Sequence, residues 1–577
     1  MNKSLAKALI DVAMGRSEAD LCLMNANVVD VYNKEVFKSD VYIKDGYFCT
    51  FSPTTKAKEY VDLKGKYLIP GFIDGHCHIE SSHLSPSAFS DAVVPCGTTS
   101  VIADPHEICN VAGLDGLSYM LSSSEKTPLS VFLMVPSCVP ATDAESSGAI
   151  LLAKDIESVL NNPRLLGLGE MMNYPGVVYN DDKVIDKLEC CYKRGKNIDG
   201  HAPAVNGKEL DAYAACRITT DHECATPEEL HDRIRRGMYV QLRQGTACKN
   251  VLDLLPGVNK ANANRVMFCT DDRQPQTIKE DGHINHGVNL AIQAGFDPIY
   301  AISMATLSAA TCYHLEDRGA IAPGLRADCF ISQSLENIKA EEVFILGESV
   351  AKNGVITKKA PHVKPEKVEG MMNIGDFRED KLRLHLNSDH VRVIDIIPGG
   401  VVTGSGEAYV KRDKDGYFVH DDNVDILKLA VVERHHGTGN VGLGLIRGYG
   451  MKDGAVATSI AHDSHNIIVV GSNDRDMALA IKELVRLGGG ITMVKDGKVI
   501  ASHRLEIGGL MTDDSAEEVC KTLEEMHSLC DKYLQVNKNI DPFMTLCFMA
   551  LPVIPELKLT DKGLFDVTKF SSVPIEL

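Results

Sequence analysis

Hydrophobic and polar positions follow two different periods along the chain. Residues 20–66 alternate with a period of two, and turn sequences such as KDG and KGK separate the apolar runs. This pattern predicts a small β unit, because alternate side chains of a strand point to opposite faces. The opening stretch MNKSLAKALIDVAMGRSEAD predicts a helix. We therefore expect residues 1–66 to form an N-terminal helix and the first part of a small β domain.

After residue 66 the pattern changes to short β-like runs, each followed by a helical stretch. Eight such runs follow one another: YLIPGFIDGHCHI, TSVIAD, SVFLMVPS, LLGLGE, NIDGHA, ITTDHE, YVQLRQG and VMFCTDD. Eight strand–helix units within residues 67–318 match a (β/α)8 barrel of the TIM type, which usually has about 250 residues. Catalytic groups of such barrels lie at the C-terminal ends of the strands.

Two further regions follow the predicted barrel. Residues 319–360 are β-like again, and we expect them to complete the small β domain as a sandwich built from segments that flank the barrel. The basic, proline-containing stretch TKKAPHVKPEKVEG is typical of a linker. Residues 373–577 predict a C-terminal α/β domain. The expected fold class is thus α/β: a barrel, a small β-sandwich domain and a C-terminal α/β domain.

Composition narrows the range of partners. Hydrophobic residues make up 44% and charged residues 24% of the chain, which is typical of a soluble globular protein. No apolar stretch approaches the roughly 20 residues of a membrane helix, so we expect no membrane contact. The formal net charge of −19 repels phosphate backbones and disfavours nucleic acid as a partner. The 17 scattered cysteines, with no signal-peptide pattern, predict reduced thiols in the cytoplasm.

Metal-binding side chains recur where the predicted barrel strands end. A single His-x-His pair is more typical of a turn, although its spacing does point both imidazoles to one face of a strand. Here, however, six ligand-type residues fall at strand ends that converge on one mouth. Four imidazoles and two carboxylates match a pair of divalent ions, with Glu170 placed to bridge them. The six residues are His76, His78, Glu170, His201, His222 and Asp271.

The predicted ions indicate hydrolytic chemistry. Bound divalent ions lower the pKa of water and polarise a substrate atom. Asp271 ends the eighth strand, where its carboxylate can bind an ion and accept a proton from the attacking water. Asp272 follows it, and alternation along the strand turns this side chain to the other face. The set predicts hydrolysis at a carbonyl or amidine-like carbon.

The sequence around these residues resembles the adenine deaminases of the amidohydrolase superfamily. In the predicted barrel the resemblance is carried by PGFIDGHCHIESSHLSPSAFSDAVVPCGTTSVIADPHEICNVAG, GLGEMMNYPGV, DGHAP, TTDHE, CTDDR and GHINHGVNLAI. It continues through SIAHDSHNIIVVG, HRLEIGGLM and DPFMTLCFMALPVIPELKLTDKGLFDV, and so covers nearly the whole chain. It implies hydrolysis of adenine to hypoxanthine and ammonia.

The resemblance also implies the cofactors and the partner. It implies two divalent metal ions, Mn²⁺ first and Fe²⁺ or Zn²⁺ as alternatives. One ion would be held by His76, His78 and Asp271, and the other by His201 and His222, with the carboxylate on strand four bridging them. A small purine is the implied substrate. The resemblance further implies a homo-oligomer, for which we expect a dimer.

Four polar residues just beyond strands one and two have open roles: Glu80, His83, His106 and Glu107. They would contact purine nitrogens, carry the proton to the leaving ammonia, or hold an accessory ion. The two carboxylates are the candidates for proton transfer, and the two imidazoles are candidates for substrate contact. The alternative is that all four support and orient the imidazoles of the first strand.

Two residues near strands seven and eight are further candidates for substrate binding. Arg243 is placed to face the substrate, although charged residues also fill barrel mouths without binding anything. Asp272 would bind the purine if its carboxylate faces the substrate rather than the metals.

A group of polar residues in the last region admits two interpretations. The first is a polar interface. The second is that the C-terminal domain packs over a barrel mouth, its own or a neighbour's, and helps to close it. The group comprises His435, His436, His462, Asp463 and His465.

Two other functions compete with adenine deamination. One is a different binuclear amidohydrolase that opens a cyclic amide or removes an acyl group. Many such relatives carry a carboxylated lysine on strand four, where this chain has Glu170. The other is a non-catalytic scaffold on an amidohydrolase frame, which would be expected to have lost metal ligands, whereas all six are present here.

Overall fold

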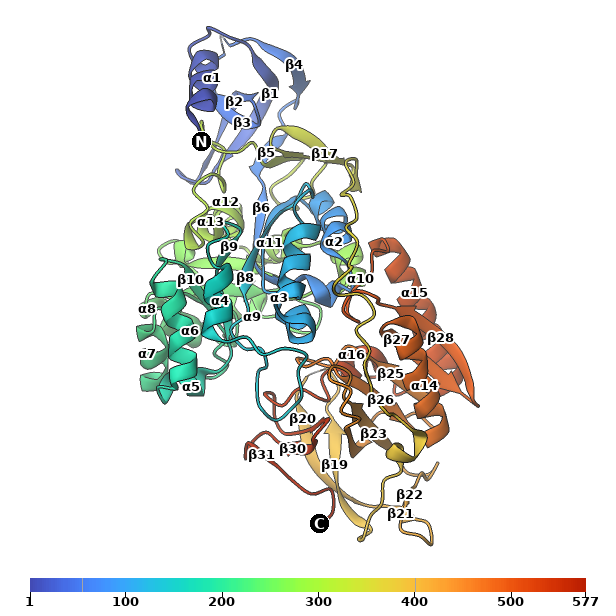
Figure 1. Ribbon diagram of the computed structural model, residues 1–577. Coiled ribbons are helices and arrows are strands. Elements are labelled where there is room, and N and C mark those ends of the chain that lie inside the picture. Colours follow the sequence, from blue (N-terminus) through green and yellow to red (C-terminus); the bar gives the residue numbers. More distant parts are fainter. Residues whose placement is uncertain (54, 400) are drawn as a thin grey trace.

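The computed structural model describes residues 1–577 except 54 and 400. A nine-stranded sheet joins strands from the beginning of the chain, β1–β5, to strands that follow its central part, β15–β18 (Figure 1). Its strand order is β18-β17-β16-β15-β5-β1-β2-β3, with β4 paired to β1. Apolar side chains from both halves, such as Leu23 and Phe344, share one buried cluster. The bounds are α1 Lys3–Ala13, β1 Ala19–Asp30, β2 Glu35–Lys44, β3 Tyr47–Thr50, β4 Ala57–Asp62, β5 Tyr67–Pro70, β15 Cys329–Ser332, β16 Glu342–Ile345, β17 Glu348–Lys352 and β18 Val355–Ile356.

This sheet differs from the sandwich that the sequence predicted. A sandwich has two separate sheets, whereas one path of hydrogen bonds runs through eight of these strands here, and β4 joins it by pairing with β1. The reason is β5, which pairs with β1 on one side and with β15 on the other. Antiparallel pairing of Ile69 with Phe330 is one of the contacts that fuse the halves.

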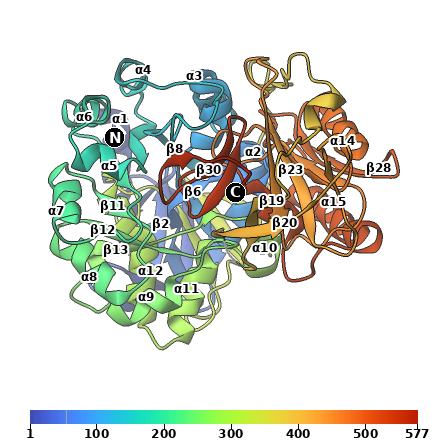
Figure 2. The same ribbon diagram turned by 90° about the horizontal axis from the view of Figure 1, so that it is seen from below.

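The middle of the chain forms a curled parallel sheet with helices outside it (Figures 1 and 2). Strands β6 to β10 lie in order with β14 beside β6, and β11, β12 and β13 form a second parallel set. Because β10 contacts β11 and β13 contacts β6, the two sets follow one curved path. The strands are β6 Phe72–His78, β7 Thr98–Ala103, β8 Ser130–Val135, β9 Leu165–Met171, β10 Asn197–Gly200, β11 Thr220–Asp221, β12 Tyr239–Arg243, β13 Val266–Cys269 and β14 Asp271–Asp272.

Helices alternate with these strands along the chain, so this part is an α/β arrangement. Every residue of β6 and β7 is buried, as expected for parallel strands covered on both faces. The helices are α2 Pro86–Val93, α3 His106–Ser123, α4 Ala153–Val159, α5 Tyr174–Val178, α6 Asp182–Tyr192, α7 Gly207–Ala215, α8 Pro227–Arg235, α9 Val251–Leu254, α10 Pro275–Asp281, α11 Ile284–Gln293, α12 Pro298–Ser303 and α13 Ala309–Cys312.

The last part of the chain is a separate sheet domain. Its eight-stranded sheet has the order β20-β19-β24-β23-β26-β25-β27-β28, and α14 packs on β25, β26 and β27. Its helices are α14 Asp474–Leu487, α15 Ala516–Leu529 and α16 Pro542–Cys547. Its strands are β19 His390–Ile396, β20 Thr403–Tyr409, β21 Lys411–Arg412, β22 Phe418–Val419, β23 Ile426–Val432, β24 Val441–Arg447, β25 Ala455–Thr458, β26 Ile467–Gly471, β27 Gly490–Lys495, β28 Lys498–Arg504, β29 Leu557–Thr560, β30 Gly563–Asp566 and β31 Ser571–Ser572.

The C-terminal sheet domain lies against the loops that leave the parallel strands (Figure 1). Just beyond β6, the Thr512 N–H donates to the carbonyl of His83 at 2.8 Å. Beyond β8, the Ser146 N–H donates to the Asp561 carboxylate at 2.9 Å. These contacts place the domain over the carboxyl ends of the parallel strands. Among the described residues, no helix combines the length and the apolar character that crossing a membrane requires.

A buried ion pair fixes two of the loops at these strand ends. Arg233 on α8 donates to the Asp221 carboxylate at 2.9 Å and to the carbonyl of Ala202 at 2.8 Å. The other oxygen of Asp221 accepts from the N–H groups of Ala202 and Glu223. Both charged side chains are fully buried. The pair therefore ties the loops after β10 and β11 to the helix behind them.

Replacing Arg233 should destabilise the protein strongly. Arg233→Ala leaves the Asp221 carboxylate buried without its cation, and such losses cost about 3–5 kcal/mol. We expect a clear fall in the melting temperature, measured by differential scanning fluorimetry. Arg235→Ala on the same helix is the matched control. Arg235 and its partner Asp232 are both exposed, and an exposed ion pair contributes at most about 1 kcal/mol to the free energy of unfolding. Equal melting temperatures of the two variants would contradict the assigned role.

Candidate active site

The predicted metal ligands meet at the carboxyl ends of the parallel strands. They reach this place from separate strands: β6 carries two of them, β9 carries one, and the others lie at or just after β10, β11 and β14. Ligand atoms of His76, Glu170, His222 and Asp271 lie within 4.8 Å of one another, and all four residues are buried. The fold thus brings the six predicted ligands into one cluster.

Glu170 lies at the centre of this cluster, between two pairs of imidazoles. Its Oε1 atom is 2.9 Å from the Nε2 atoms of both His76 and His78. Its Oε2 atom is 2.8 Å from Nδ1 of His201 and 3.8 Å from Nε2 of His222. One carboxylate oxygen therefore faces each pair, which is the arrangement that a bridging ligand requires.

The hydrogen bonding of the cluster fits bound cations. Nδ1 of His78 donates to the carbonyl of Asp104 at 2.9 Å, which directs the lone pair of Nε2 at the two carboxylates of the cluster. Metal-binding histidines usually donate their other ring N–H in this way. Oε1 of Glu170 and Nδ1 of His201 are buried without hydrogen-bond partners. Ligand atoms roughly 3 Å apart also suit an ion about 2.1 Å from each.

Asp271 contacts both the cluster and a neighbouring cation. Its Oδ1 is 3.1 Å from Nε2 of His78, and its Oδ2 accepts from Arg243 at 2.6 Å. Burial alone would raise the pKa of Asp271, but the Arg243 guanidinium and His78 hold it well below its usual range. The carboxylate is therefore ionised at neutral pH. Asp272 accepts from the Ser81 hydroxyl and lines a neighbouring cavity, although its carboxylate also lies within 4.8 Å of ligand atoms of His78 and Asp271.

Glu223 is a member of this site that the sequence did not single out. Its Oε1 is 3.3 Å from Nε2 of His222 and 3.7 Å from Nδ1 of His201, and it accepts from Arg243 at 2.6 Å. Burial opposes ionisation of Glu223, but His201 and Arg243 lower its pKa. Its place directly after His222, at a strand end, was the available signal.

Asp74 supports the site from beneath and was likewise not assigned a role. Its carboxylate accepts from the backbone N–H of His76 at 3.2 Å, and from the hydroxyl and N–H of Thr270 at 2.5 and 3.1 Å. It thereby ties the first strand of the set to the segment that ends in Asp271.

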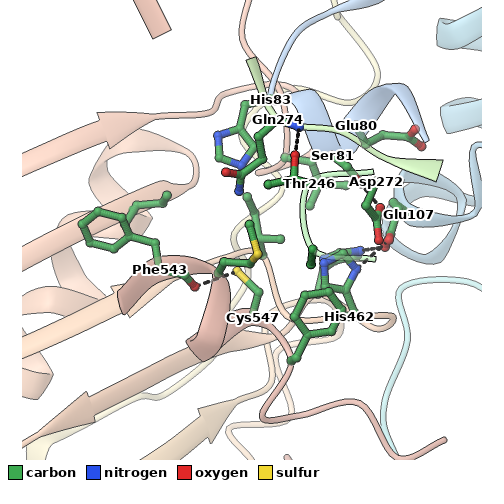
Figure 3. A pocket seen from close by; sticks show the side chains of 17 residues that line it. Glu80, Ser81, His83, Glu107, Thr246, Asp272, Gln274, His462, Phe543 and Cys547 are labelled. Carbon is green, nitrogen blue, oxygen red and sulfur yellow. Dashed lines mark hydrogen bonds and ion pairs between the residues drawn. The ribbon is translucent and has the colours of Figure 1, made fainter. Parts of the chain in front are cut away.

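A cavity lies beside the cluster, between the strand ends and the C-terminal domain (Figure 3). On the side of the parallel strands, the cavity is lined by Glu80, His83, Glu107 and Asp272. His106 lies between this cavity and the cluster, with its ring 4.6 Å from that of His78. The C-terminal domain contributes an apolar wall and two imidazoles: Ile460, His462, His465, Ile491, Leu510, Phe543, Met544, Cys547 and Phe548.

Arg243 lies on the other side of the cluster and lines a second cavity. Glu223, Pro203 and Asn250 line it too. His201 is the predicted ligand nearest to solvent, since 24% of its side chain is exposed, against 3% for Glu170. The cluster therefore lies between two cavities, one under the C-terminal domain and one opening beside β11 and β12.

The histidines of the C-terminal domain reach the parallel-strand part of their own chain. His462 and His465 both hydrogen bond to the Glu107 carboxylate, and Nε2 of His436 donates to the carbonyl of Ser147 at 2.8 Å. His435 instead donates to Ser464 within the domain. Of the two interpretations left open by the sequence, these contacts favour a domain that closes the strand ends of its own chain.

Comparisons with known proteins agree along the whole chain. Residues 67–358 match the amidohydrolase family, and residues 400–571 match the adenine deaminase C-terminal domain. "Adenine deaminase 2" of Desulfotalea psychrophila is 49% identical, and the adenine deaminase of Ligilactobacillus salivarius is 47% identical, each over 100% of both chains. A crystal structure of an adenine deaminase is 16% identical, covers 57% of this chain and 99% of its own, and has a TM-score of 0.45. The chain belongs to the amidohydrolase family and, over its full length, to the adenine deaminases within that family.

Proposed function

We propose that this protein hydrolyses adenine to hypoxanthine and ammonia. The observation that carries the proposal is the Glu170 carboxylate, held between two pairs of imidazoles next to a cavity of mixed polar and apolar lining. Full-length relatives named adenine deaminase support the choice of substrate. A scaffold without activity would not need this buried set of ligands, and an amidase of the lysine type would not have a glutamate at its centre.

We further propose that the parallel strands close into a (β/α)8 barrel, with β13 and β14 together forming the eighth strand. The cluster would hold two divalent ions: His76, His78 and Asp271 on one, His201 and His222 on the other, and Glu170 between them. Mn²⁺ is the proposed metal, with Fe²⁺ or Zn²⁺ as alternatives. The ions, when bound, polarise the substrate and lower the pKa of water. A homodimer and a cytoplasmic location stay predictions.

The side chains around the cluster suggest how the reaction proceeds. Asp271 is ionised and faces the cluster, so it is placed to accept a proton from the water that attacks C6 of the purine. The C6–N6 bond then breaks and ammonia leaves, which requires a proton at the amino nitrogen. Glu107 and Glu80 both line the cavity next to the cluster. Glu80, whose pKa is raised to about 7 by burial, is the proposed carrier of that proton, because both oxygens of Glu107 already accept from His462 and His465. Asp272, His106 and His83 would contact the purine ring.

Adenine should be the preferred substrate over adenosine. The cavity is closed on one side by the C-terminal domain, and no ribose-binding motif accompanies it. We expect purified, Mn²⁺-loaded protein to release ammonia from adenine and to act far more slowly on adenosine, in a coupled ammonia assay. A tenfold preference for adenosine, equivalent to about 1.4 kcal/mol in the transition state, would refute the proposed substrate.

Glu170 should be needed for occupancy by two ions. Glu170→Gln replaces one of two anionic oxygens by an amide nitrogen, which cannot bind a cation. We expect fewer than two ions per chain by plasma emission spectrometry after loading with Mn²⁺, and loss of activity. Glu189→Gln is the control, since Glu189 is exposed on α6, where it pairs with Lys193. Two ions and a full rate in Glu170→Gln would show that Glu170 does not bridge.

Asp271 and Asp272 should not substitute for one another, because Arg243 binds Asp271 beside the cluster, whereas Asp272 accepts from Ser81 and lines the cavity. Asp271→Asn keeps an oxygen towards the metals but cannot accept a proton, and general-base catalysis is typically worth about 10²–10⁴-fold in rate. We expect kcat to fall by at least that range with much of the metal retained. Asp272→Asn should mainly raise KM. Steady-state kinetics with metal analysis of the same samples test both, and near-normal kcat in metal-loaded Asp271→Asn would point to Glu80 or Glu107 as the base.

A further inference from the structure

The carboxylate of Glu107 forms hydrogen bonds with the imidazoles of His462 and His465. These two residues belong to the C-terminal domain and lie more than 350 positions later in the sequence. Glu107 lies in the first turn of α3 and is 2% exposed. Nδ1 of His462 lies 2.6 Å from its Oε1, and Nε2 of His465 contacts its Oε2. All three side chains line the cavity beside the cluster (Figure 3). Two histidines and a glutamate in contact could either bind another metal ion or form a hydrogen-bonded unit.

The tautomer of His465 decides between these possibilities. Its Nδ1 accepts a hydrogen bond from the backbone N–H of Ala461 at 3.2 Å, so Nδ1 carries no proton. The proton of the neutral ring is therefore on Nε2, which donates it to Glu107. A metal ligand needs the opposite arrangement, in which the nitrogen away from the metal donates, as His78 does to Asp104. The three residues are thus a hydrogen-bonded unit.

His462 has one nitrogen committed to this unit and one left over. Its Nδ1 donates to Glu107, whereas its Nε2 makes no hydrogen bond to any residue of the described chain. The ring stacks on Phe548, with centroids 4.6 Å apart and planes inclined by 16°. Glu107 at one edge and Phe548 at one face therefore fix the direction in which Nε2 points, and the residue lines the cavity.

The charge around the ring makes its free nitrogen a donor. Burial would lower the pKa of His462, but the Glu107 carboxylate raises it to about 9. A purine ring offers nitrogen acceptors, to which the protonated ring of His462 can donate. The C-terminal domain thus supplies a donor that complements the acceptors of the ring.

We propose that His462 is a substrate-binding residue contributed by the C-terminal domain, whose Nε2 donates a hydrogen bond to a ring nitrogen of the purine while Glu107 holds the imidazole in place. This inference rests on the proposed function, since it takes adenine as the substrate. Such a bond withdraws electron density from the ring and favours attack of water at C6. The C-terminal domain then contributes to the choice of substrate ring, and the residues at the ends of the parallel strands carry out the deamination.

The variant His462→Asn tests this assignment. An asparagine amide can keep a hydrogen bond to Glu107 but has no atom in the place of Nε2. We expect kcat/KM for adenine to fall by about 10²-fold while two ions stay bound and the melting temperature changes little. His390→Asn is the matched control, because His390 belongs to the same domain, is partly exposed and stacks on Tyr409 away from the cavity. Equal kinetics in His462→Asn and the parent protein would overturn the proposal.

Deaza analogues identify the acceptor and separate this test from that of the function. Kinetics with 1-, 3- and 7-deazaadenine should reveal one analogue that the parent protein processes as poorly as His462→Asn processes adenine. For that analogue the variant should cause no further loss. Equal additional losses for all three would refute a bond to a ring nitrogen. Unsubstituted purine has no amino group to lose, so its affinity can be measured by calorimetry independently of the rate with adenine. We expect the variant to bind it about tenfold or more weakly. Unchanged affinity would overturn the assignment.

Discussion

The structure depends on keeping one carboxylate charged although it is buried. Glu170 is 3% exposed and faces four imidazoles, and burying such a group without compensation is very costly. Burial would raise its pKa, but His222 and His76 hold it well below its usual range. Its backbone is fixed as well, because the Glu170 N–H donates to the Asp104 carboxylate at 2.8 Å. The strands of the parallel sheet are the frame that holds these partners at fixed distances.

The surrounding charges follow from this constraint. Arg243 compensates two acids at once, donating to Asp271 and Glu223 at 2.6 Å each, on the side of the cluster that opens to solvent. On the opposite side the compensation comes from another domain, whose imidazoles pair with Glu107. Acidic groups near the cluster are therefore neutralised by a guanidinium on one side and by histidines on the other. This explains why the C-terminal domain contacts the barrel through polar side chains as well as apolar ones.

Much of this site could be predicted from the sequence, because the signals are local. His76 and His78 share a strand face, and Glu170, His201 and Asp271 end later strands, so the strand–helix pattern alone brings them to one mouth. Asp74 and Glu223 were missed because a single acid next to a histidine has no distinctive spacing. The contact between His462 and Glu107 could not be derived, since nothing local fixes how two domains dock. The continuous nine-stranded sheet was missed for the same reason. The pairing of β5 with both β1 and β15 joins strands far apart in the sequence, and no local pattern specifies it.

The two sides of the cavity come from different parts of the chain: the parallel-strand part carries the proposed metal ligands, and the C-terminal domain supplies the wall opposite them. Residues of the parallel-strand part that line the cavity lie close to strand ends: Glu80 follows β6, Glu107 follows β7 and Asp272 belongs to β14. Residues on the C-terminal side, such as Phe548 and Ile460, belong to a separate sheet domain, whose helix α15 also packs against α10 and α2. Substitutions there can reshape the wall of the cavity while Glu170 and its imidazoles stay in place. The hydrogen bonds from His462 and His465 to Glu107 limit that freedom, because they require the domain to dock in one position over the strand ends.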